Sequence, residues 1–454
     1  MEKKKEMHLL LAVLATGVMS FTGVLIETAM NVTFPVLIDQ YQVSTASVQW
    51  VTTIYLLMIS IVVPLSTYLH KNFSLRNLFV FSNIIFLLGI VIDFVAPSFA
   101  ILLVGRVFQG VATGIALPLM FHIILTYAPL AKRGTMMGLG TLTTSIAPAI
   151  GPTYGGLLTT SFSWHYIFLF LIPILIVTLG IGLYAIPNQK IKKTGSLDVL
   201  SVLGLVLLFS GFLIFLSMLG KPLSWLYLLV GICGFILFYK RSVTSAQPLI
   251  QLSVLKNPSF RLFLFSFLIY QFLLLGASFV LPNFIQIVKG QSAFVSGLAM
   301  LPGAIVGAVL SPLSGKLLDK VGAKKPILIG LAITTIGWTL LLLMLGISPV
   351  AGLIACHVFY MIGIGISYSN MMTTGMNAVP DKLQGDANAV FNTLQQFSGA
   401  LATSLVAVII GVAQNVEGRT YEASTVIGSQ FALGILLIFL LLSGVSCLRY
   451  FLKK

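Results

Sequence analysis

A single carboxylate, Glu27, interrupts the first long apolar run of the chain, in the stretch VLIETAMNVTFP. No other charged side chain lies between Leu9 and Pro35. An ionised side chain at the centre of a lipid-exposed helix costs about 2.5–3.5 kcal/mol. Because burial disfavours the charged form, a carboxylate in this position can take up a proton and release it again. We therefore predict that Glu27 carries a proton. The alternative is a structural carboxylate held by hydrogen bonds or by an arginine.

Arg106 is the complementary feature, since it is the one Lys or Arg placed well inside an apolar run. A guanidinium stays charged in proteins, so a buried one needs partners. Of the eleven acidic residues, only Glu27 and Asp93 fall within apolar runs, and we expect Asp93 near an outer end, just before Pro97. The sequence therefore predicts two uses for Arg106. It either communicates with the protonation site or makes a structural pair.

The composition of the chain decides which class of protein can hold these groups. Of its 454 residues, 58% are hydrophobic and 8% are charged, and the mean hydropathy is +1.05. Soluble domains carry about 25% charged residues, so we predict an all-α integral membrane protein. The formal net charge of +15 comes from Lys and Arg clusters between the apolar runs. This distribution is typical of membrane topology and argues against nucleic-acid binding.

The patterns of common catalytic and metal sites are missing from the sequence. It contains no P-loop, no HExxH and no Gly-x-Ser-x-Gly stretch. Its three cysteines lie in apolar runs without CxxC spacing. We therefore expect no enzyme activity, no metal and no cofactor, with the proton as the coupling ion. Without a nucleotide-binding site, an ion gradient or the substrate's own gradient remains as the energy source.

Fourteen apolar runs are long enough to cross a bilayer, which takes about 20 residues. They cover residues 8–36, 46–69, 75–96, 98–128, 134–160, 163–187, 197–219, 223–240, 260–288, 293–318, 325–346, 349–376, 387–413 and 425–448. Lys and Arg gather in alternate loops, which predicts that these loops and both termini are cytoplasmic. The basic start MEKKK precedes a run too long for a signal-peptide core, so we expect a first membrane span. The predicted location is the plasma membrane.

Two of the basic loops resemble each other and indicate an internal repeat. PLSTYLHKNFSLRN (64–77) follows the second run, and PLSGKLLDKVGAKK (312–325) follows the tenth. A shift of eight runs implies two six-helix halves separated by two extra helices, and such repeats are common in transporters. We predict an N-terminal half at 1–190, an inserted pair with a cytoplasmic linker at 191–258, and a C-terminal half at 259–454. Chance similarity of two turn-rich loops is the alternative.

Four stretches resemble motifs of the major facilitator superfamily. SPLSGKLLDKVGAKK resembles its loop signature, LLVGRVFQGVATG its fourth-helix motif and APAIGPTYGG its fifth-helix antiporter motif. IETAMNVTFP resembles the first-helix motif of the fourteen-span drug–proton antiporters, which more often has Asp in place of Glu27. The other matching residues are Gly105, Arg106, Gln109 and Gly110 in the fourth helix, Gly151, Pro152, Gly155 and Gly156 in the fifth, and Gly315, Asp319, Lys320, Gly322 and Lys324 in the loop.

This resemblance covers essentially the whole chain and implies a major facilitator fold. It implies a proton-coupled antiporter that exports hydrophobic or cationic drugs by alternating access. Glu27 would exchange protons, and Arg106 would communicate with it through Gln109 or water. The glycines and proline of the antiporter motif imply a kinked, closely packed helix, with ordinary packing as the alternative. In the first-half loop Lys71 stands where the second half has Asp319, so the family's acidic loop contact is expected only in the C-terminal half.

Polar and aromatic residues within the runs are candidates for a broad cavity that binds amphipathic or cationic small molecules. For each of them, helix packing is the alternative. The candidates are Asn31, Tyr55, Gln109, Tyr154, Asn370, Asn392 and Gln396. The expected partners are small molecules, protons and membrane lipids, without nucleic acid, and we expect a monomer. Three other functions stay open: a proton-coupled flippase for lipids or lipid precursors, an exchanger of metal–tetracycline complexes, and a non-transporting scaffold or sensor.

Overall fold

The computed structural model describes residues 8–188, 197–245 and 248–453, without the side chains of residues 130–135, 137–139, 141–145 and 381. The described residues form helices and no strands. The helices are α1 (Leu9–Asn31), α2 (Phe34–Tyr41), α3 (Thr45–Val48), α4 (Trp50–Val62), η1 (Val63–Leu65), α5 (Ser66–Asn72), α6 (Leu75–Phe94), α7 (Phe99–Tyr127), α8 (Leu130–Ser161), α9 (Tyr166–Leu169), α10 (Leu171–Ala185), α11 (Val199–Ser217), α12 (Ser224–Thr244), η2 (Leu252–Lys256), α13 (Pro258–Ile287), α14 (Ala293–Val321), α15 (Lys324–Met344), α16 (Val350–Met376), η3 (Asp381–Leu383), α17 (Gln384–Gln414) and α18 (Tyr421–Lys453).

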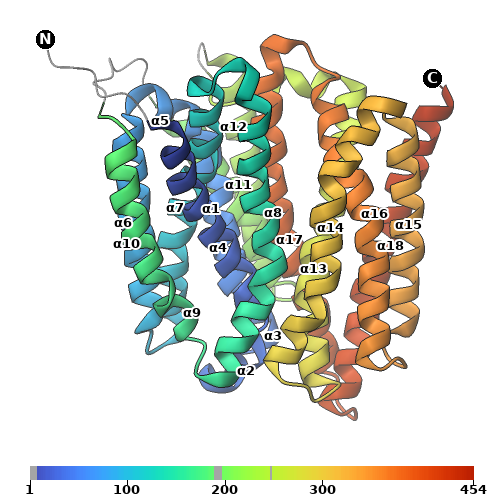
Figure 1. Cartoon of the computed structure of the whole chain (residues 1–454). Coiled ribbons are helices and arrows are strands. Elements are labelled where there is room, and N and C mark those ends of the chain that lie inside the picture. Colours follow the sequence, from blue (N-terminus) through green and yellow to red (C-terminus); the bar gives the residue numbers. More distant parts are fainter. Residues whose placement is uncertain (1–7, 189–196, 246–247, 454) are drawn as a thin grey trace, which may run out of the picture.

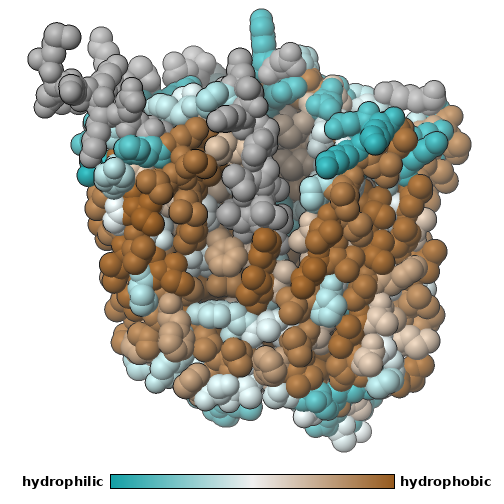
Figure 2. All heavy atoms as spheres, in the orientation of Figure 1, coloured by the Kyte–Doolittle hydropathy of each residue, from teal (hydrophilic) through white to brown (hydrophobic). Residues whose placement is uncertain are grey.

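The long helices stand side by side and form one bundle (Figure 1). Thirteen stretches of the described residues are long and apolar enough to cross a membrane. A helix of about 20 residues rises about 30 Å, the thickness of the hydrocarbon core. On the face shown in Figure 2, hydrophobic residues form a broad belt between two more polar ends. These features confirm the prediction of an all-α, multi-pass membrane protein.

The fifth predicted run, 134–160, lies in α8, which is not one of these thirteen stretches. The helix is 32 residues long, but its sequence is rich in Gly, Thr and Pro. Such residues lower the hydropathy of a helix and at the same time let neighbouring helices approach closely. α8 packs against α1 and α14. The count of fourteen spans therefore stays a prediction.

The two ends of the bundle can be told apart by the helices that begin or finish there. The start of α1 and the end of α18 lie at the same end, which we name the termini side (Figure 1). The opposite end, named the far side, holds the short helices α2, α3 and α9 (Figure 1). Consecutive long helices run in opposite directions, so the position of a residue along its helix gives its depth. Glu27, one turn before the end of α1, therefore lies in the half nearer the far side.

Prolines set the ends of two of the first helices. The predicted run 8–36 divides into α1, which ends at Asn31, and α2, which has Pro35 in its first turn. Pro64 lies in η1, which separates α4 from α5 within the second run. Proline fits the first turn of a helix, where its missing N–H has no intrahelical acceptor. Glu27 is consequently closer to a helix end than the length of the apolar run suggests.

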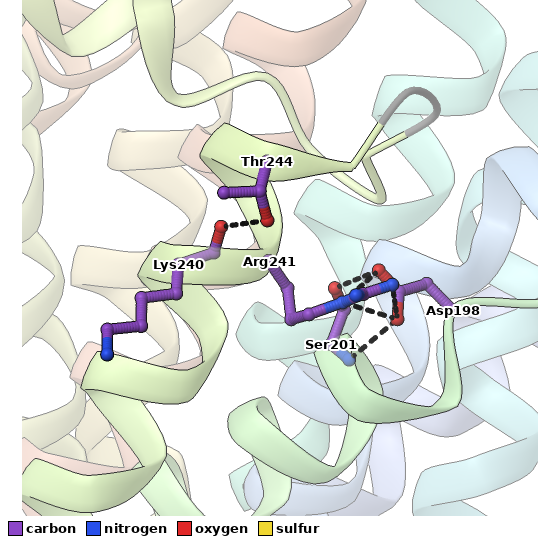
Figure 3. Close-up of polar contacts among 5 residues, drawn as sticks. All are labelled: Asp198, Ser201, Lys240, Arg241 and Thr244. Carbon is purple, nitrogen blue, oxygen red and sulfur yellow. Dashed lines mark hydrogen bonds and ion pairs between the residues drawn. The ribbon is translucent and has the colours of Figure 1, made fainter.

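Helices α11 and α12 pack against each other, and α11 also contacts α4 and α17. Asp198 caps α11 by accepting hydrogen bonds from the Ser201 backbone N–H at 3.2 Å and from its hydroxyl at 2.8 Å. Arg241 of α12 forms an ion pair with the same carboxylate at 3.2 Å (Figure 3). Burial opposes ionisation, but the hydrogen bonds from Ser201 and Arg241 outweigh it and hold the pKa of Asp198 below its usual value. The two helices are therefore joined by one local polar contact, and the boundaries 191–258 stay a prediction.

Hydrogen bonds join helices α1–α10 to helices α13–α18 in the half of the bundle nearer the far side. They connect Asn31 with Ser278, Thr45 with Gln414 and Tyr421, Thr53 with Thr403, Thr153 with Gly297, Thr160 with Phe294, and Gln286 with Val32. We name this set of contacts the far-side seam. In the described part of the chain, no hydrogen bond joins the two sets of helices in the half nearer the termini. In the observed conformation, hydrogen bonds thus hold the two sets of helices together at the far side.

Candidate functional site

Arg106 is the centre of a buried polar network on α7. Its side chain is 0% exposed. The Nε–H donates to the carbonyl oxygen of Val51 at 2.9 Å, and the guanidinium carbon lies 4.3 Å from the centre of the Tyr55 ring. The hydroxyl of Tyr55 donates to Thr113 at 2.9 Å. An aromatic face is a favourable neighbour for a desolvated cation, so α4 and α7 together fix the position of this guanidinium.

Gln109 links Arg106 to a second charged residue. The Nη1 of Arg106 donates to the Gln109 Oε1 at 2.7 Å, and the Gln109 Nε2 donates to the Asp93 Oδ2 at 2.7 Å. A guanidinium only donates, so its contact fixes the carbonyl end of the Gln109 amide and turns the NH₂ group towards Asp93. The chain Arg106–Gln109–Asp93 therefore has a defined polarity. Each end of the Gln109 amide is matched to one charge.

Asp93 lies near the far-side end of α6, as its position before Pro97 suggests, but it is 0% exposed. Two glycines make room for the carboxylate between α6 and α7. A Cβ on Gly105 would overlap the carboxylate of Asp93 and would lie 2.8 Å from the carbonyl oxygen of Gly89. Sequence reasoning missed the link between Asp93 and Arg106. The signal that could have found it is the pair of glycines, one next to Arg106 and one a turn before Asp93.

Glu27 faces the same network from α1. It is 7% exposed and interacts electrostatically with Arg106 and Tyr55. One turn earlier, a Cβ on Gly23 would lie 2.6 Å from the Thr113 hydroxyl and 3.0 Å from the Tyr55 hydroxyl, so this face of α1 touches α4 and α7. Among the described residues, Glu27 has no hydrogen-bond partner and no ion pair within 4.0 Å. We name Glu27, Asp93 and Arg106, with the linking Gln109, the charge cluster.

Asn31 was predicted as a cavity residue, and its observed contacts place it between helices. Its Nδ2 donates to the Ser278 hydroxyl on α13 at 2.8 Å, and its Oδ1 accepts from Thr52 on α4 at 2.9 Å. Asn31 lies one turn after Glu27 on α1. The residue therefore connects the helix of the charge cluster to the far-side seam.

The predicted antiporter motif lies in α8 and packs against two helices. Gly151 and Gly155 lie against α1, where a Cβ on Gly155 would be 2.9 Å from the Cα and carbonyl carbon of Ala29. Gly156 lies against α14, where a Cβ would be 2.8 Å from the carbonyl carbon of Ala293. The carbonyl group of Pro152 lies against Gly297 in the same way. Small residues thus allow three helices to approach backbone to backbone.

Three of the remaining predicted cavity residues form hydrogen bonds with residues outside the charge cluster. The Tyr154 hydroxyl donates to the Ile167 carbonyl oxygen at 2.9 Å, the Asn370 Nδ2 to the Ser314 hydroxyl at 2.6 Å and the Ile366 carbonyl oxygen at 3.0 Å, and the Asn392 Nδ2 to the Asn388 carbonyl oxygen at 2.8 Å. Gln396 is half-buried on α17. Of the seven candidates, Tyr55 and Gln109 contact Arg106, and Asn31 lies one turn after Glu27 on α1.

A second polar group lies among α13, α16 and α17. The Tyr368 hydroxyl donates to the Gln271 Oε1 at 2.7 Å and accepts from the Gln395 Nε2 at 2.9 Å. The Phe267 ring stacks on Tyr368 with 4.4 Å between centres. Gln395 was missed, because helical periodicity cannot decide which of two adjacent glutamines, Gln395 or Gln396, faces a partner helix.

The loop motif lies at the termini side, at the end of α14. Gly322 ends that helix with φ +76°, a conformation that favours glycine because it has no Cβ. Asp319, Lys320 and Lys324 are exposed, and Gly315 is half-buried with open space where a Cβ would be. In the described residues, Asp319 takes part in no ion pair.

Besides the Asp198–Arg241 ion pair, two histidines of the described residues lie close together outside the charge cluster. The rings of His70 and His122 stack with 4.2 Å between centres and join α5 to α7. No group of three His, Cys, Asp or Glu side chains in the described ranges could hold a metal ion. In the charge cluster, two carboxylates interact electrostatically with one buried guanidinium.

Comparison with known proteins identifies the family. Residues 16–403 match the family model that is described as Major Facilitator Superfamily. The chain is 35% identical to lincomycin resistance protein LmrB of Bacillus subtilis (strain 168) over 421 residues, 91% of this chain and 87% of that protein. It is 27% identical to multidrug export protein EmrB of Escherichia coli (strain K12) over 329 residues, 70% and 64% of the two chains.

A solved structure shares the fold. It is the crystal structure of a bacterial homologue of the human lysosomal transporter Spinster in an inward-facing and unoccupied conformation. The TM-score is 0.68 with 14% sequence identity, and 97% of each chain is covered. This likeness confirms the major facilitator fold, and the family match with the relatives LmrB and EmrB confirms the resemblance to the drug transporters of that family. The chain belongs to the Major Facilitator Superfamily.

Proposed function

We propose that this transporter exports hydrophobic or cationic antimicrobial compounds across the plasma membrane in exchange for protons. The observation that carries the proposal is the charge cluster, a buried, unpaired Glu27 beside a buried Arg106. The printed names of LmrB and EmrB, lincomycin resistance and multidrug export, support the substrate class. Neither the flippase nor the scaffold alternative receives comparable support.

The proton would reside on Glu27. An ionised carboxylate without hydrogen bonds or an ion pair is unfavourable in a buried site. Among the described residues Glu27 has neither, which supports a neutral, protonated Glu27 in the observed conformation. Release of that proton would leave a negative charge in the site. A cationic or polarisable substrate can compensate this charge, and the two ligands would therefore exchange.

Alternating access would open and close the far-side seam. Lys and Arg are concentrated in the loops of the termini side, which supports a cytoplasmic location for that side. The far side would then face the exterior, and the observed conformation would be closed to it. Residues 1–190 and 259–454 would rock against each other, while the inserted helices of 191–258 would stay peripheral.

The test is a comparison of Glu27→Gln with the wild-type transporter in cells and in proteoliposomes. We expect cells that produce Glu27→Gln to lose resistance to lincomycin and ethidium, and vesicles to lose the proton movement driven by these compounds. Asp39→Asn is the matched control, since Asp39 is an exposed carboxylate on α2. Proton-coupled uptake of either compound by folded Glu27→Gln vesicles, at the wild-type rate, would contradict the proposal.

A further inference from the structure

Proton exchange at Glu27 leaves one question about the charge cluster. Arg106 is fully buried and keeps its positive charge at any physiological pH. When Glu27 carries a proton it is neutral and cannot compensate Arg106. A buried unpaired cation is strongly unfavourable, so another anion must serve the guanidinium in the loaded state.

Asp93 is placed to be that anion. It is held at hydrogen-bond distance from Gln109, whose other end binds Arg106. The close approach of Gly89 and Gly105 forms a space that the carboxylate fills. Among the side chains that the structure describes, the electrostatic partners of Arg106 are Tyr55, Asp93 and Glu27, so Asp93 is the one acidic partner besides Glu27.

The neighbourhood of Asp93 contains few other titratable groups. On α2, Tyr41 interacts with it electrostatically, and the Tyr41 hydroxyl donates to the Ala96 carbonyl oxygen at 3.0 Å. On α7 the neighbours are Arg106 and Gln109. The Asp93 Oδ1 and the Arg106 Nη2 are buried and have no hydrogen-bond partner among the described residues. Asp93 and Arg106, the two charged ends of the chain through Gln109, therefore each keep one buried polar atom without a hydrogen bond.

Counting charges gives the protonation state of the cluster. Arg106 contributes one positive charge, and two ionised carboxylates would contribute two negative charges. A buried site favours the combination closest to neutral, which is one carboxylate protonated and one ionised. Asp93 accepts a hydrogen bond from Gln109, and Glu27 accepts none from the described residues. Asp93 is the more deeply buried of the two, which disfavours its charge, but hydrogen bonding acts in the opposite direction and favours the ionised form at Asp93 and the protonated form at Glu27.

We propose that Asp93 is the permanent counter-ion of Arg106, and that this pairing through Gln109 lets Glu27 bind and release a single proton. Asp93 is a positioning residue, because it acts through Gln109 and Arg106 on the exchange at Glu27. This inference rests on the proposed proton exchange at Glu27. It adds that Asp93, a residue of α6, determines the proton affinity of Glu27.

The test measures proton release from purified transporter in weakly buffered detergent solution on addition of ethidium, as a function of pH. In Asp93→Asn, Glu27 becomes the one remaining anion for Arg106 and keeps its ionised form to lower pH. An opposite charge nearby changes proton affinity by about tenfold or more. We therefore expect the midpoint of the release profile to move towards acid by about 1 pH unit or more.

A charge-relocating rescue separates this role from a structural one. In the double variant Asp93→Asn/Gln109→Glu, the carboxylate is moved to position 109 and the amide to position 93. The cluster again holds one fixed anion beside Arg106, so the midpoint should return to within a few tenths of a pH unit of wild type. Asp39→Asn is the control for loss of a carboxylate, with an expected shift near zero.

Two results would overturn the inference. One is a monodisperse Asp93→Asn transporter with the wild-type midpoint, and the other is a double variant as strongly shifted as Asp93→Asn. Failure of the proposed function is a different outcome, because then the wild type itself releases no proton on addition of ethidium. Should Asp93→Asn alone elute as aggregate, the double variant decides the matter, since a wild-type midpoint supports the proposal and an acid-shifted one contradicts it.

Discussion

Substitution of Gly155 tests whether α8 acts as part of a gate. Gly155 lies where α8 touches α1, and a Cβ at this position would lie 2.9 Å from the Cα and carbonyl carbon of Ala29. Atoms at that distance overlap, and both belong to the backbone of α1. No side-chain rotation can relieve the contact, so α1 and α8 must separate in Gly155→Ala and separate further in Gly155→Leu.

The size of the effect follows from the overlap. Inserting a methyl group into a close-packed interface costs about 1–3 kcal/mol. If opening of the far-side seam parts α1 from α8, the cost applies mainly to the closed state. A penalty of about 1–3 kcal/mol changes the ratio of closed to open transporter by about 5- to 150-fold. Gly155→Ala should thus shift the population towards the form open at the far side.

The assay is labelling of a cysteine introduced at Ser278 with a membrane-impermeant maleimide in intact cells. Ser278 accepts the hydrogen bond of Asn31 within the far-side seam, so its exposure reports opening. The native Cys233, Cys356 and Cys447 are replaced first. Gly180→Ala is the matched control, because nothing lies within 4 Å of the position that its Cβ would occupy.

We expect faster labelling and slower lincomycin efflux for Gly155→Ala, with a larger effect for Gly155→Leu and no change for Gly180→Ala. The reasoning would be refuted by Gly155→Leu protein that is produced normally, labels at the control rate and exports lincomycin at the control rate. In that case α1 and α8 would have to accommodate the side chain without affecting the seam. The glycines would then be ordinary packing residues.

Two further predictions concern polar contacts. Asn31→Ala removes the hydrogen bonds to Ser278 and Thr52, at about 1 kcal/mol for each one, and should raise labelling at the far side in the same maleimide assay. Asp198→Ala should lower the melting temperature more than Arg241→Ala, because it removes a helix cap worth about 1 kcal/mol as well as a partly exposed ion pair worth about 0–1 kcal/mol. The pKa of Asp198 is lower in the folded chain than in the unfolded chain. The ionised carboxylate therefore stabilises the fold at neutral pH, and this stabilisation is lost as the pH falls through the folded-state pKa. Differential scanning fluorimetry between pH 7 and pH 3 would measure the loss.

Local sequence patterns predict the membrane helices well because hydropathy and length act within one segment. Glu27 and Arg106 were identified for the same reason, as single charges in long apolar runs. Even the shortest predicted span, 223–240, is a helix, α12. The end of α1 was less predictable, since Pro35 continues the apolar run while it begins a separate helix.

The partners of these charges depend on contacts between helices, which no local pattern encodes. Asp93 was assigned to an outer end from its distance to Pro97, and its burial requires that Gly89 meet Gly105 across two helices. Asn31 reaches a hydroxyl 247 residues further along the chain. Its spacing on α1 is equally compatible with a cavity, so sequence alone could not distinguish the two environments.

The last two turns of α1 bring the parts of the site together. On one face Glu27 meets the network of Arg106 and Tyr55. On another face Ala29 touches Gly155 of α8. Asn31, the last residue of α1, donates a hydrogen bond to a hydroxyl of α13. Because these contacts lie within five consecutive residues of one helix, a movement of Glu27 towards Arg106 on loss of the proposed proton would shift both the contact with α8 and the seam contact with α13. This coupling would not require a longer path through the protein, since the proposed proton site and the proposed gate lie on two faces of the same helical segment.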